Sequence, residues 1–472
     1  MNAKTKGYPG LMSVVLESQA AWFVLALYTS FSYFEADPRL VGGLALLAAV
    51  LFMNSLARSE LFFGRLNLGK FHNNPISRLL RFTTDEAELA GIFVALICSL
   101  MILIDDRGAE VFGHIPYYQA ITLFGIMSAA TFAVRQMSQI LAYVEKRLGA
   151  RAALFVGAVL STFTGEPAAA MFLSEFAKAR IANTKAARTA TGKGLGVVIG
   201  YGGAAFLPFS APPILIVWAI LQGVFGWTIG HLVFFVGIAA MINVWVGLGP
   251  FWKCLAGGRR DGVDETDQAL QLLPLLYLAV VVLANIFASN HLIVMCLNVA
   301  TGAASMVYAA RQQYPAGDHE AKFQAVWQPL ILGVLLIGLE IIGIEAEPLL
   351  RWVGSTIPAS FPPVLVATIL FFAAAWSSHI ADNALASRVF ISVAAALVAS
   401  SFPTSGDLFA AAVLLGALFG GFLLIPANLP NFPLSKAFGI SAGEWLKDKP
   451  GAYYLRGALI CLVWLLLLSV IL

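Results

Sequence analysis

The sequence predicts an all-α, polytopic membrane protein of about 11 spans and two re-entrant hairpins, arranged as two inverted repeats. Three observations lead to this prediction: the composition, the lengths of the apolar runs and the distribution of basic residues. Hydrophobic residues make up 59% and charged residues 12% of the 472 residues, and the mean hydropathy is +0.82. A soluble fold of this composition has too few polar residues to cover its surface. The lipid bilayer is therefore the expected partner, and the net charge of +3 is no evidence for nucleic acid.

Apolar runs long enough to cross a hydrocarbon core of about 30 Å predict the spans. They lie at 13–34, 40–57, 89–104, 117–134, 194–221, 228–252, 271–288, 291–309, 329–344, 407–437 and 456–472. Two apolar regions remain, 151–179 and 362–400, and polar residues interrupt each of them near its middle. No clear small-residue cleavage site follows the first run, so we expect a retained span and not a signal peptide.

The basic residues indicate how the chain threads through the membrane. If the N-terminus is cytoplasmic and 151–179 enters and leaves on one side, 25 of the 29 Lys and Arg residues fall in cytoplasmic linkers. These linkers are 1–12, 58–88, 135–151, 178–193, 253–270, 310–328 and 436–456. Such a bias follows the positive-inside rule of a bacterial inner membrane and leaves the C-terminus periplasmic. Segment 58–88, which is basic with interspersed apolar residues, is expected to lie along the cytoplasmic headgroups.

The first interrupted region carries Thr164-Gly165-Glu166-Pro167 at its centre, with basic clusters on both flanks. A full span here would put one of those clusters outside, so the charge distribution favours a re-entrant hairpin with this motif at its tip. A glutamate followed by a helix-breaking proline is costly at membrane depth unless it binds something polar. The motif therefore predicts a binding site.

The second interrupted region enters from the outside by the same reasoning, and its tip is Ser377-Ser378-His379-Ile380-Ala381-Asp382-Asn383. Each hairpin is followed by a long span that is itself broken by prolines. The breaks are predicted at 206–213 and 425–433. Non-helical backbone at membrane depth is tolerated where it lines a cavity, so the tips and breaks are expected to converge near the midplane.

The two hairpin-plus-broken-span units have nearly equal spacing. Ser210 follows Glu166 by 44 residues, and Asn428 follows Asp382 by 46. Equal units that enter from opposite faces are typical of an inverted repeat. The predicted organisation is a scaffold unit at 1–150, a transport unit at 151–221, connecting and scaffold helices at 222–361, a second transport unit at 362–437, and a linker with the final helix at 438–472.

The chemistry of the tips indicates the ligand. The carboxylates of Glu166 and Asp382 make a hard-oxygen site that suits sodium, lithium or protons. The other expected ligands are freed backbone carbonyls and the side chains of Thr162, Thr164, Ser377, Ser378, Asn383, Asn428 and Asn431. Burial favours the protonated carboxyl group whereas bound sodium favours the ionised one, so one group can exchange the two ions. Asn383 also has a structural interpretation, as a turn former.

Other polar residues have both a functional and a structural interpretation. His379, beside Asp382, is a candidate proton relay or a hydrogen-bonded structural residue. Glu340 is a candidate second titrating group or one half of an ion pair within the scaffold. Arg388 either neutralises an acid or extends to the interface, and Glu166 itself either binds the ion or only caps a half-helix.

These motifs and their order resemble the ion transporter superfamily. The residues that carry the resemblance are 164–167, 379–383 and 425–431, and they look most like a bacterial sodium/proton antiporter family with NhaD-type architecture. The resemblance covers nearly the whole chain and implies alternating access, an elevator-like motion and a homodimer held by scaffold spans. In the superfamily's dicarboxylate symporters, the sequences of the hairpin tips resemble Ser-Asn-Thr. The tips of this sequence carry the acids Glu166 and Asp382 instead.

The predicted function is cation/proton antiport, with Na⁺ (or Li⁺) and H⁺ as the transported ions and no resident cofactor or enzymatic activity. One alternative is a sodium-coupled symporter of a small organic anion such as a dicarboxylate, for which Arg388, Asn428 and Asn431 are the candidate ligands. A second alternative is a membrane enzyme or assembly factor that uses the two tip acids and His379 for acid–base chemistry. No nucleophile elbow or nucleotide-binding motif supports that second alternative.

Overall fold

The regular structure is helical throughout the part of the chain that is described, as predicted for an all-α protein. The computed structural model describes residues 117–178, 180–181, 184–209, 211–255, 272–288, 290–312, 350, 352–380, 383–422, 428, 430–440, 444–445 and 450–472. The principal helices are α7 (Tyr117–Phe132), α8 (Val134–Leu148), α9 (Ala150–Thr164), α10 (Glu166–Lys178), α11 (Lys185–Ala204), α12 (Pro212–Leu215), α13 (Trp218–Gly223), α14 (Ile229–Leu232), the π-helix η2 (Val233–Gly237), α15 (Ile238–Leu255), α16 (Leu272–Phe287), α17 (His291–Gln312), α20 (Pro363–Ile380), α21 (Asn383–Ser400), α22 (Gly406–Gly420), α23 (Asn431–Phe438) and α25 (Pro450–Ile471).

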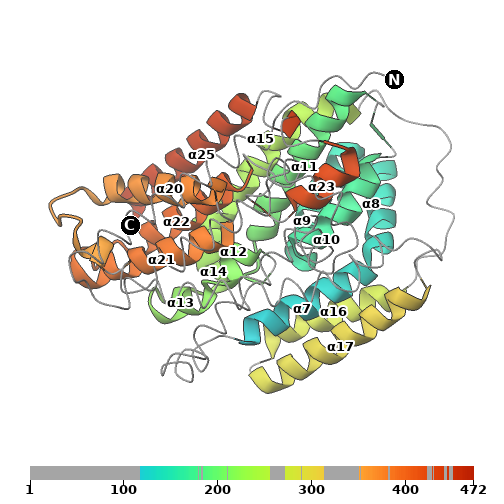
Figure 1. Cartoon of the computed structure of the whole chain (residues 1–472), viewed down its shortest axis with the longest axis horizontal. Coiled ribbons are helices and arrows are strands. Elements are labelled where there is room, and N and C mark those ends of the chain that lie inside the picture. Colours follow the sequence, from blue (N-terminus) through green and yellow to red (C-terminus); the bar gives the residue numbers. More distant parts are fainter. Residues whose placement is uncertain are drawn as a thin grey trace, which may run out of the picture.

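The helices form three neighbouring groups (Figure 1). Helices α7, α16 and α17 pack on one another at one end of the molecule. Helices α20, α21, α22 and α25 form a second group. Helices α9, α10 and α23 gather around α11, and α8 packs on α9 and α10. Helix α11 also packs on α15, so it lies at the centre of the arrangement and contacts elements from both halves of the chain.

Helix α8 occupies most of the predicted linker at 135–151. The chain bends by 61° between α7 and α8 and continues as a helix to Leu148. Met137 and Leu141 are buried on one side of α8, at helical spacing, so the segment has an apolar face that packs on its neighbours. Lys146 and Arg147 lie in its last turn, where positive charge stabilises the carbonyl end of a helix.

Helices α9 and α10 form a tightly connected pair. Helix α9 is bounded by Gly149 (φ 86°) and Gly165 (φ 78°), which take up a backbone conformation that favours glycine. The two helices have 15 and 13 residues, so each is roughly 20 Å long at 1.5 Å per residue. They pack against each other, and each is shorter than a hydrocarbon core of about 30 Å.

Breaks follow both helix pairs. Thr184 caps the N-terminus of α11 by accepting a hydrogen bond from the Ala187 amide at 3.2 Å, and the helix ends at Ala204. Helix α12 begins only at Pro212, so the predicted break at 206–213 separates two helices. Helix α22 likewise ends at Gly420, and α23 begins at Asn431. The described residues of the breaks, 205–209 and 211 in the first and 421–422, 428 and 430 in the second, lie outside helices.

Several helices are suited to a membrane. By length and composition three segments could cross it, Ile229–Val246, His291–Tyr308 and Asn383–Ser400, and the bent pair α7–α8 makes a fourth if it is one span. The predicted spans at 13–34, 40–57, 89–104 and 329–344 and the amphipathic segment 58–88 lie outside the described residues. The described helices thus agree with a membrane protein, while the expected number of spans stays a prediction.

The outer surface supports the same class. Large apolar side chains are exposed along α16, α17, α20 and α25, including Leu276, Leu292, Phe372 and Leu466. Surfaces this apolar are normally covered by lipid or by a partner. Helix α22 is instead buried on every side from Leu408 to Gly420, as expected for an all-apolar helix at the centre of a bundle.

Candidate functional site

The site begins at the break between α9 and α10. The Gly165 amide closes α9 by donating to the Ser161 carbonyl at 3.0 Å, and Glu166 is the first residue of α10. Glu166 is completely buried. The amide end of a helix carries a partial positive charge that stabilises an adjacent carboxylate. The turn after α9 therefore fixes an acid at the start of a short buried helix.

Glu166 lies directly against the end of α11. A Cβ atom built on Gly203 would be 2.9 Å from Cγ of Glu166, closer than real Cβ contacts come. On the α9 side, Thr162 donates from Oγ1 to the Gly203 carbonyl at 3.3 Å. The last carbonyls of a helix carry partial negative charge and attract cations. Glu166 is thus held where a second source of negative potential, the C-terminus of α11, is close by.

Thr164 has a local role. Its Oγ1 donates to the Leu160 carbonyl at 3.1 Å, one turn earlier in α9, and the side chain is buried. A threonine that bonds back to its own helix satisfies its hydroxyl without a ligand. Thr164 was predicted as a ligand, and the hydrogen bond observed here supports the end of α9.

A second group of polar side chains surrounds the end of α22. Asn383, the first residue of α21, and Asn428 in the break are both buried. A Cβ atom on Gly421 would be 3.2 Å from Cβ of Asn428 and 3.4 Å from Nδ2 of Asn383. Asn431, the first residue of α23, donates from Nδ2 to the Gly421 carbonyl at 2.7 Å. Three predicted amide ligands therefore meet around one glycine.

Two of these amides make no side-chain hydrogen bond to the described residues. Neither the oxygen nor the nitrogen of the Asn383 and Asn428 side chains has a hydrogen-bond partner within the described part of the chain. Both side chains are at most 1% exposed. A buried polar group without a partner costs about 1–3 kcal/mol, and such groups commonly mark a ligand or water site. These two amides are the strongest indication that the site takes a ligand.

Helix α11 connects the two groups through glycines on one face. Gly196 lies against Asn431, whose Oδ1 would be 2.8 Å from an added Cβ, and Gly200 lies against Asn428, whose Nδ2 would be 3.1 Å away. Gly203 lies against Glu166, as described above. Spacings of four and three residues keep these glycines on one face, over about 10 Å of helix. The breaks after both helix pairs therefore meet along this face, which we call the glycine face of α11.

The end of α20 is attached to α22. Ser378 donates from Oγ to the Ala417 carbonyl at 2.8 Å, and Nδ1 of His379 is hydrogen-bonded to the Gly420 carbonyl. Both side chains are buried, whereas Ser377 is only partly buried and is not brought against the glycine face by any observed contact. Ser378 and His379 thus hold the end of α20 against α22.

The other predicted residues are Arg388, Asp382 and Glu340. Arg388 is buried on α21 and donates from Nη1 to Oγ of Ser392 at 2.6 Å. Asp382 and Glu340 are outside the described residues, so their predicted roles stay predictions. No cluster of three or more His, Cys, Asp and Glu side chains suited to a metal ion occurs in the described ranges. The oxygens that do converge come from one carboxylate, amides and backbone carbonyls.

Sequence reasoning missed some of the residues that shape the site. Gly196, Gly200, Gly203 and Gly421 were not among the predicted site residues. The signal was present as small residues at spacings of four and three along 196–203, a pattern that allows close approach in membranes. Ser387, also buried, has an Oγ without a hydrogen-bond partner within the described part of the chain, and it had no recognisable motif.

Comparison with known proteins adds no relative. No protein-family model matches the chain, and no curated protein matches it significantly.

Proposed function

We propose that this protein is a secondary active transporter that exchanges a hard monovalent cation, most favourably Na⁺, for protons. The observation that carries the proposal is the convergence of Glu166, Asn428 and Asn431 on the glycine face of α11 in a highly apolar chain. A buried acid surrounded by amide and carbonyl oxygens is the ligand set that hard cations prefer. Acids at membrane depth typically belong to ion or proton pathways.

The proposed architecture is a pair of inverted repeats. In each repeat, scaffold helices are followed by a re-entrant hairpin and a broken span, and the two hairpins are α9–α10 and α20–α21. The shortness of α9 and α10, which carry 15 and 13 residues, supports a re-entrant first hairpin. Helices α20 and α21 each have 18 residues, so the second hairpin would enter more deeply. The breaks that end at Pro212 and Asn431 complete the transport unit.

The proposed mechanism is competition between the ions. With a proton on Glu166 the site is neutral and can change its access; with sodium bound, the ionised carboxylate is neutralised again. The empty, charged site is the costly state to move through the membrane, so the two fluxes are coupled. Asp382 would supply the second acid from the symmetry-related tip. The resemblance described above supports an elevator-like motion within a homodimer.

The proposed location is the bacterial inner membrane, with a cytoplasmic N-terminus and a periplasmic C-terminus. The support is the basic bias of the linkers, which hold 25 of the 29 Lys and Arg residues. Fusion of a periplasm-sensitive and a cytoplasm-sensitive reporter to Leu472 tests this orientation directly. A C-terminus that reports the cytoplasm would require an even number of crossings and would contradict the proposed threading.

The decisive experiment is dissipation of a pH gradient in everted vesicles on addition of sodium, lithium, potassium or calcium. Glu166→Gln is expected to abolish the cation-dependent signal, because it keeps the shape of the side chain and removes its charge. Glu175→Gln is the matched control, since Glu175 lies on the same helix but is exposed. Asp382→Asn tests the second tip. Full exchange in both tip variants would show that the site is wrong.

The symporter alternative is tested in the same system. Uptake of succinate into proteoliposomes under an inward sodium gradient, with no cation-dependent proton movement, would replace antiport by anion symport. The tip chemistry argues against this result because Glu166 is an acid at the position where an anionic substrate needs a neutral or basic group.

A further inference from the structure

An apolar groove of about 420 Å³ lies between α9, the break after α11, η2 and α15. The described residues that line it are hydrophobic or glycine: Phe155, Phe206, Val233, Gly237, Ile238, Met241, Ile242 and Trp245. Burial of hydrocarbon against such side chains is favourable because it removes apolar surface from water. This lining therefore suits a hydrocarbon ligand.

The groove is open on the outer side of α15. Ile238, Ile242 and Trp245 are 37%, 44% and 50% exposed. All three lie in Ile229–Val246, one of the segments that are long and apolar enough to cross a membrane. Exposed apolar surface on such a segment is normally covered by lipid. The bilayer therefore supplies the molecules that reach the groove.

The dimensions of the groove suit one hydrocarbon chain. The lining residues Val233 and Trp245 are roughly 18 Å apart along the helix at 1.5 Å per residue. The volume of about 420 Å³, spread over this length, gives a mean width of about 5 Å. Carbon atoms in contact are about 4 Å apart, so a single acyl chain fits this width. A helix has a diameter of about 10–12 Å and does not fit.

One end of the groove has the features of a membrane interface. Cζ of Arg151 lies 4.1 Å from the centroid of the Trp245 ring, and the Phe155 ring packs edge-on against the same ring at 6.1 Å. Arg151 and Phe155 are one turn apart at the start of α9. Tryptophan and basic side chains are typical of the headgroup level of a bilayer. A lipid headgroup therefore belongs at this end, and the end at Val233 lies deeper.

Exposed positive charge lies close to the interfacial end. Glu145 is the acid in the last turn of α8, and its Oε2 is 2.5 Å from Nε of Arg180. Lys146 and Arg147 are exposed and form no ion pair within the described part of the chain. Arg147 precedes Arg151 by four residues, so their Cα atoms are at most about 14 Å apart. Such basic residues attract the phosphate of an anionic lipid.

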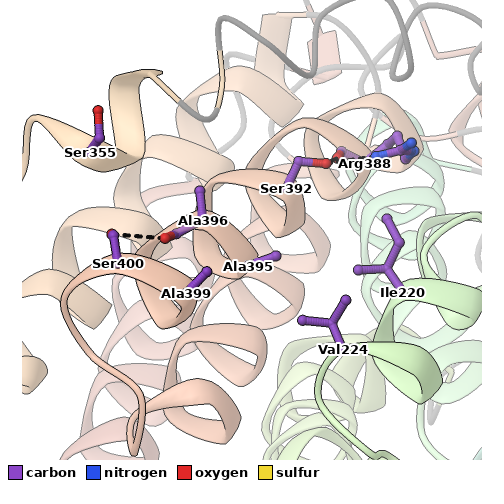
Figure 2. Close-up of a pocket in the computed structure, with 9 residues that line it drawn as sticks. All are labelled: Ile220, Val224, Ser355, Arg388, Ser392, Ala395, Ala396, Ala399 and Ser400. Atoms are coloured by element: carbon purple, nitrogen blue, oxygen red, sulfur yellow. Dashed lines mark hydrogen bonds between the residues drawn. The ribbon is translucent and has the colours of Figure 1, made fainter.

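Two other basic side chains differ from Lys146 and Arg147 in their surroundings. Arg388 is buried on α21 and donates to Oγ of Ser392 at 2.6 Å (Figure 2). Lys185 forms an ion pair with Glu444. The corner between α8 and α9 is thus a place where basic side chains are both exposed and next to an apolar groove.

The inner end of the groove touches the first break. Phe206, just beyond the end of α11, lines the groove. Gly237 of η2 lies directly against the preceding residue, since an added Cβ would be 2.2 Å from the Ala205 carbonyl oxygen. Gly203, three residues before Phe206, belongs to the proposed cation site. A chain in the groove therefore contacts the segment that leads away from that site.

We propose that the groove is a lipid-binding site in which one acyl chain of an anionic phospholipid lies along α15. The phosphate of this lipid lies at the corner between α8 and α9, where Lys146 and Arg147 are exposed. The inference does not depend on the cation/proton exchange proposed above, because other residues recognise the lipid. It places a bilayer lipid in contact with the break that follows α11.

The test is lipid binding, measured by native mass spectrometry on the full-length protein after purification and delipidation in detergent. Dioleoylphosphatidylglycerol and dioleoylphosphatidylcholine are added separately. The wild type is expected to bind one phosphatidylglycerol molecule about tenfold more tightly than phosphatidylcholine. Glycerol 1-phosphate, which has the phosphate without acyl chains, should not bind, because the chain supplies most of the affinity.

Variants that fill the groove test the position of the acyl chain. Ile238→Trp puts a larger side chain into the lining and should weaken the binding of both lipids about tenfold. Val280→Trp is the control, since Val280 is 38% exposed on α16 and does not line the groove. Size-exclusion elution identifies folded variants, and Ile242→Trp replaces Ile238→Trp if that variant aggregates.

Variants of the basic pair test the position of the phosphate. The double variant Lys146→Gln/Arg147→Gln should lose the preference for phosphatidylglycerol and bind phosphatidylcholine as the wild type does. Arg311→Gln, at an exposed position in the last turn of α17, is the control and should keep the preference.

Four results would overturn the proposal. They are equal affinities of the wild type for the two lipids, wild-type affinity in the groove-filling variants, a preference for phosphatidylglycerol that survives in the double variant, and binding of glycerol 1-phosphate as tight as that of the lipid. A wild type that binds neither lipid would also overturn it, and would indicate that a segment of this chain fills the groove.

Discussion

Glu166 and Gly203 approach so closely that a methyl group on the glycine would lie 2.9 Å from Cγ of the glutamate. The contact joins the first residue of α10 to the last turn of α11. It is the point where the helix pair α9–α10 meets the break that follows it. A residue larger than glycine at 203 cannot coexist with this position of the acid.

Gly203→Ala is therefore expected to displace Glu166 and to abolish most of the cation-dependent exchange. Overpacking of this kind costs about 1–3 kcal/mol, so thermal stability in detergent should also fall. Gly223→Ala is the control, because an added Cβ there meets nothing within 4 Å. Exchange at the wild-type rate in Gly203→Ala would show that the observed position of Glu166 is not needed for transport.

Gly165→Ala tests the turn that presents the acid. Gly165 has φ 78° and ψ 151°, and Gly149, at the other end of α9, has φ 86° and ψ 162°. An alanine in this region costs about 1–3 kcal/mol. Both Gly165→Ala and Gly149→Ala should lose stability by this amount, but only Gly165→Ala should lose exchange, since only Gly165 adjoins Glu166. Equal exchange rates in the two variants would contradict a role for the turn in transport.

Asn428→Ala and Asn431→Ala should have different consequences. Asn428 has no hydrogen-bond partner within the described residues, so its removal should leave stability nearly unchanged and raise the KM for sodium about tenfold, which is about 1.4 kcal/mol of binding. Asn431 donates to the Gly421 carbonyl, and its loss should cost about 1–3 kcal/mol of unfolding free energy. Vesicle exchange and thermal unfolding measure the two effects. A stability loss in Asn428→Ala without a change in KM would make it a structural residue.

Sequence reasoning predicted the elements of the fold better than the details of the site. The prolines predicted breaks at 206–213 and 425–433, because proline disrupts helices whatever it packs against. The observed helices end at Ala204 and Gly420 and resume at Pro212 and Asn431, so the last residues of each predicted break belong to the next helix. The helix α8 was missed because its basic residues resemble those of a linker. Periodicity also cannot show that Thr164 bonds to Leu160, since a hydroxyl that caps its own helix and one that binds an ion have the same sequence.

The glycine face of α11 is a part of the site that could not be predicted from the sequence. Gly196, Gly200 and Gly203 are visible as a spacing, but which helices approach them depends on long-range packing. The pairing of Gly200 with Asn428 joins positions 228 residues apart along the chain. Only the folded structure shows that Asn428, in the second break, packs against α11.

His379 is expected to be structural and not a proton relay. A carbonyl oxygen only accepts, so Nδ1 of His379 carries the hydrogen that bonds to Gly420. His379→Asn keeps a donor near this position and should leave the midpoint of the pH profile of exchange unchanged. His379→Leu leaves the Gly420 carbonyl without its donor and should lower the unfolding free energy by about 1–3 kcal/mol. His291→Asn, at an exposed histidine, serves as the control for the pH profile, and a midpoint shift confined to His379→Asn would assign that histidine to the proton pathway.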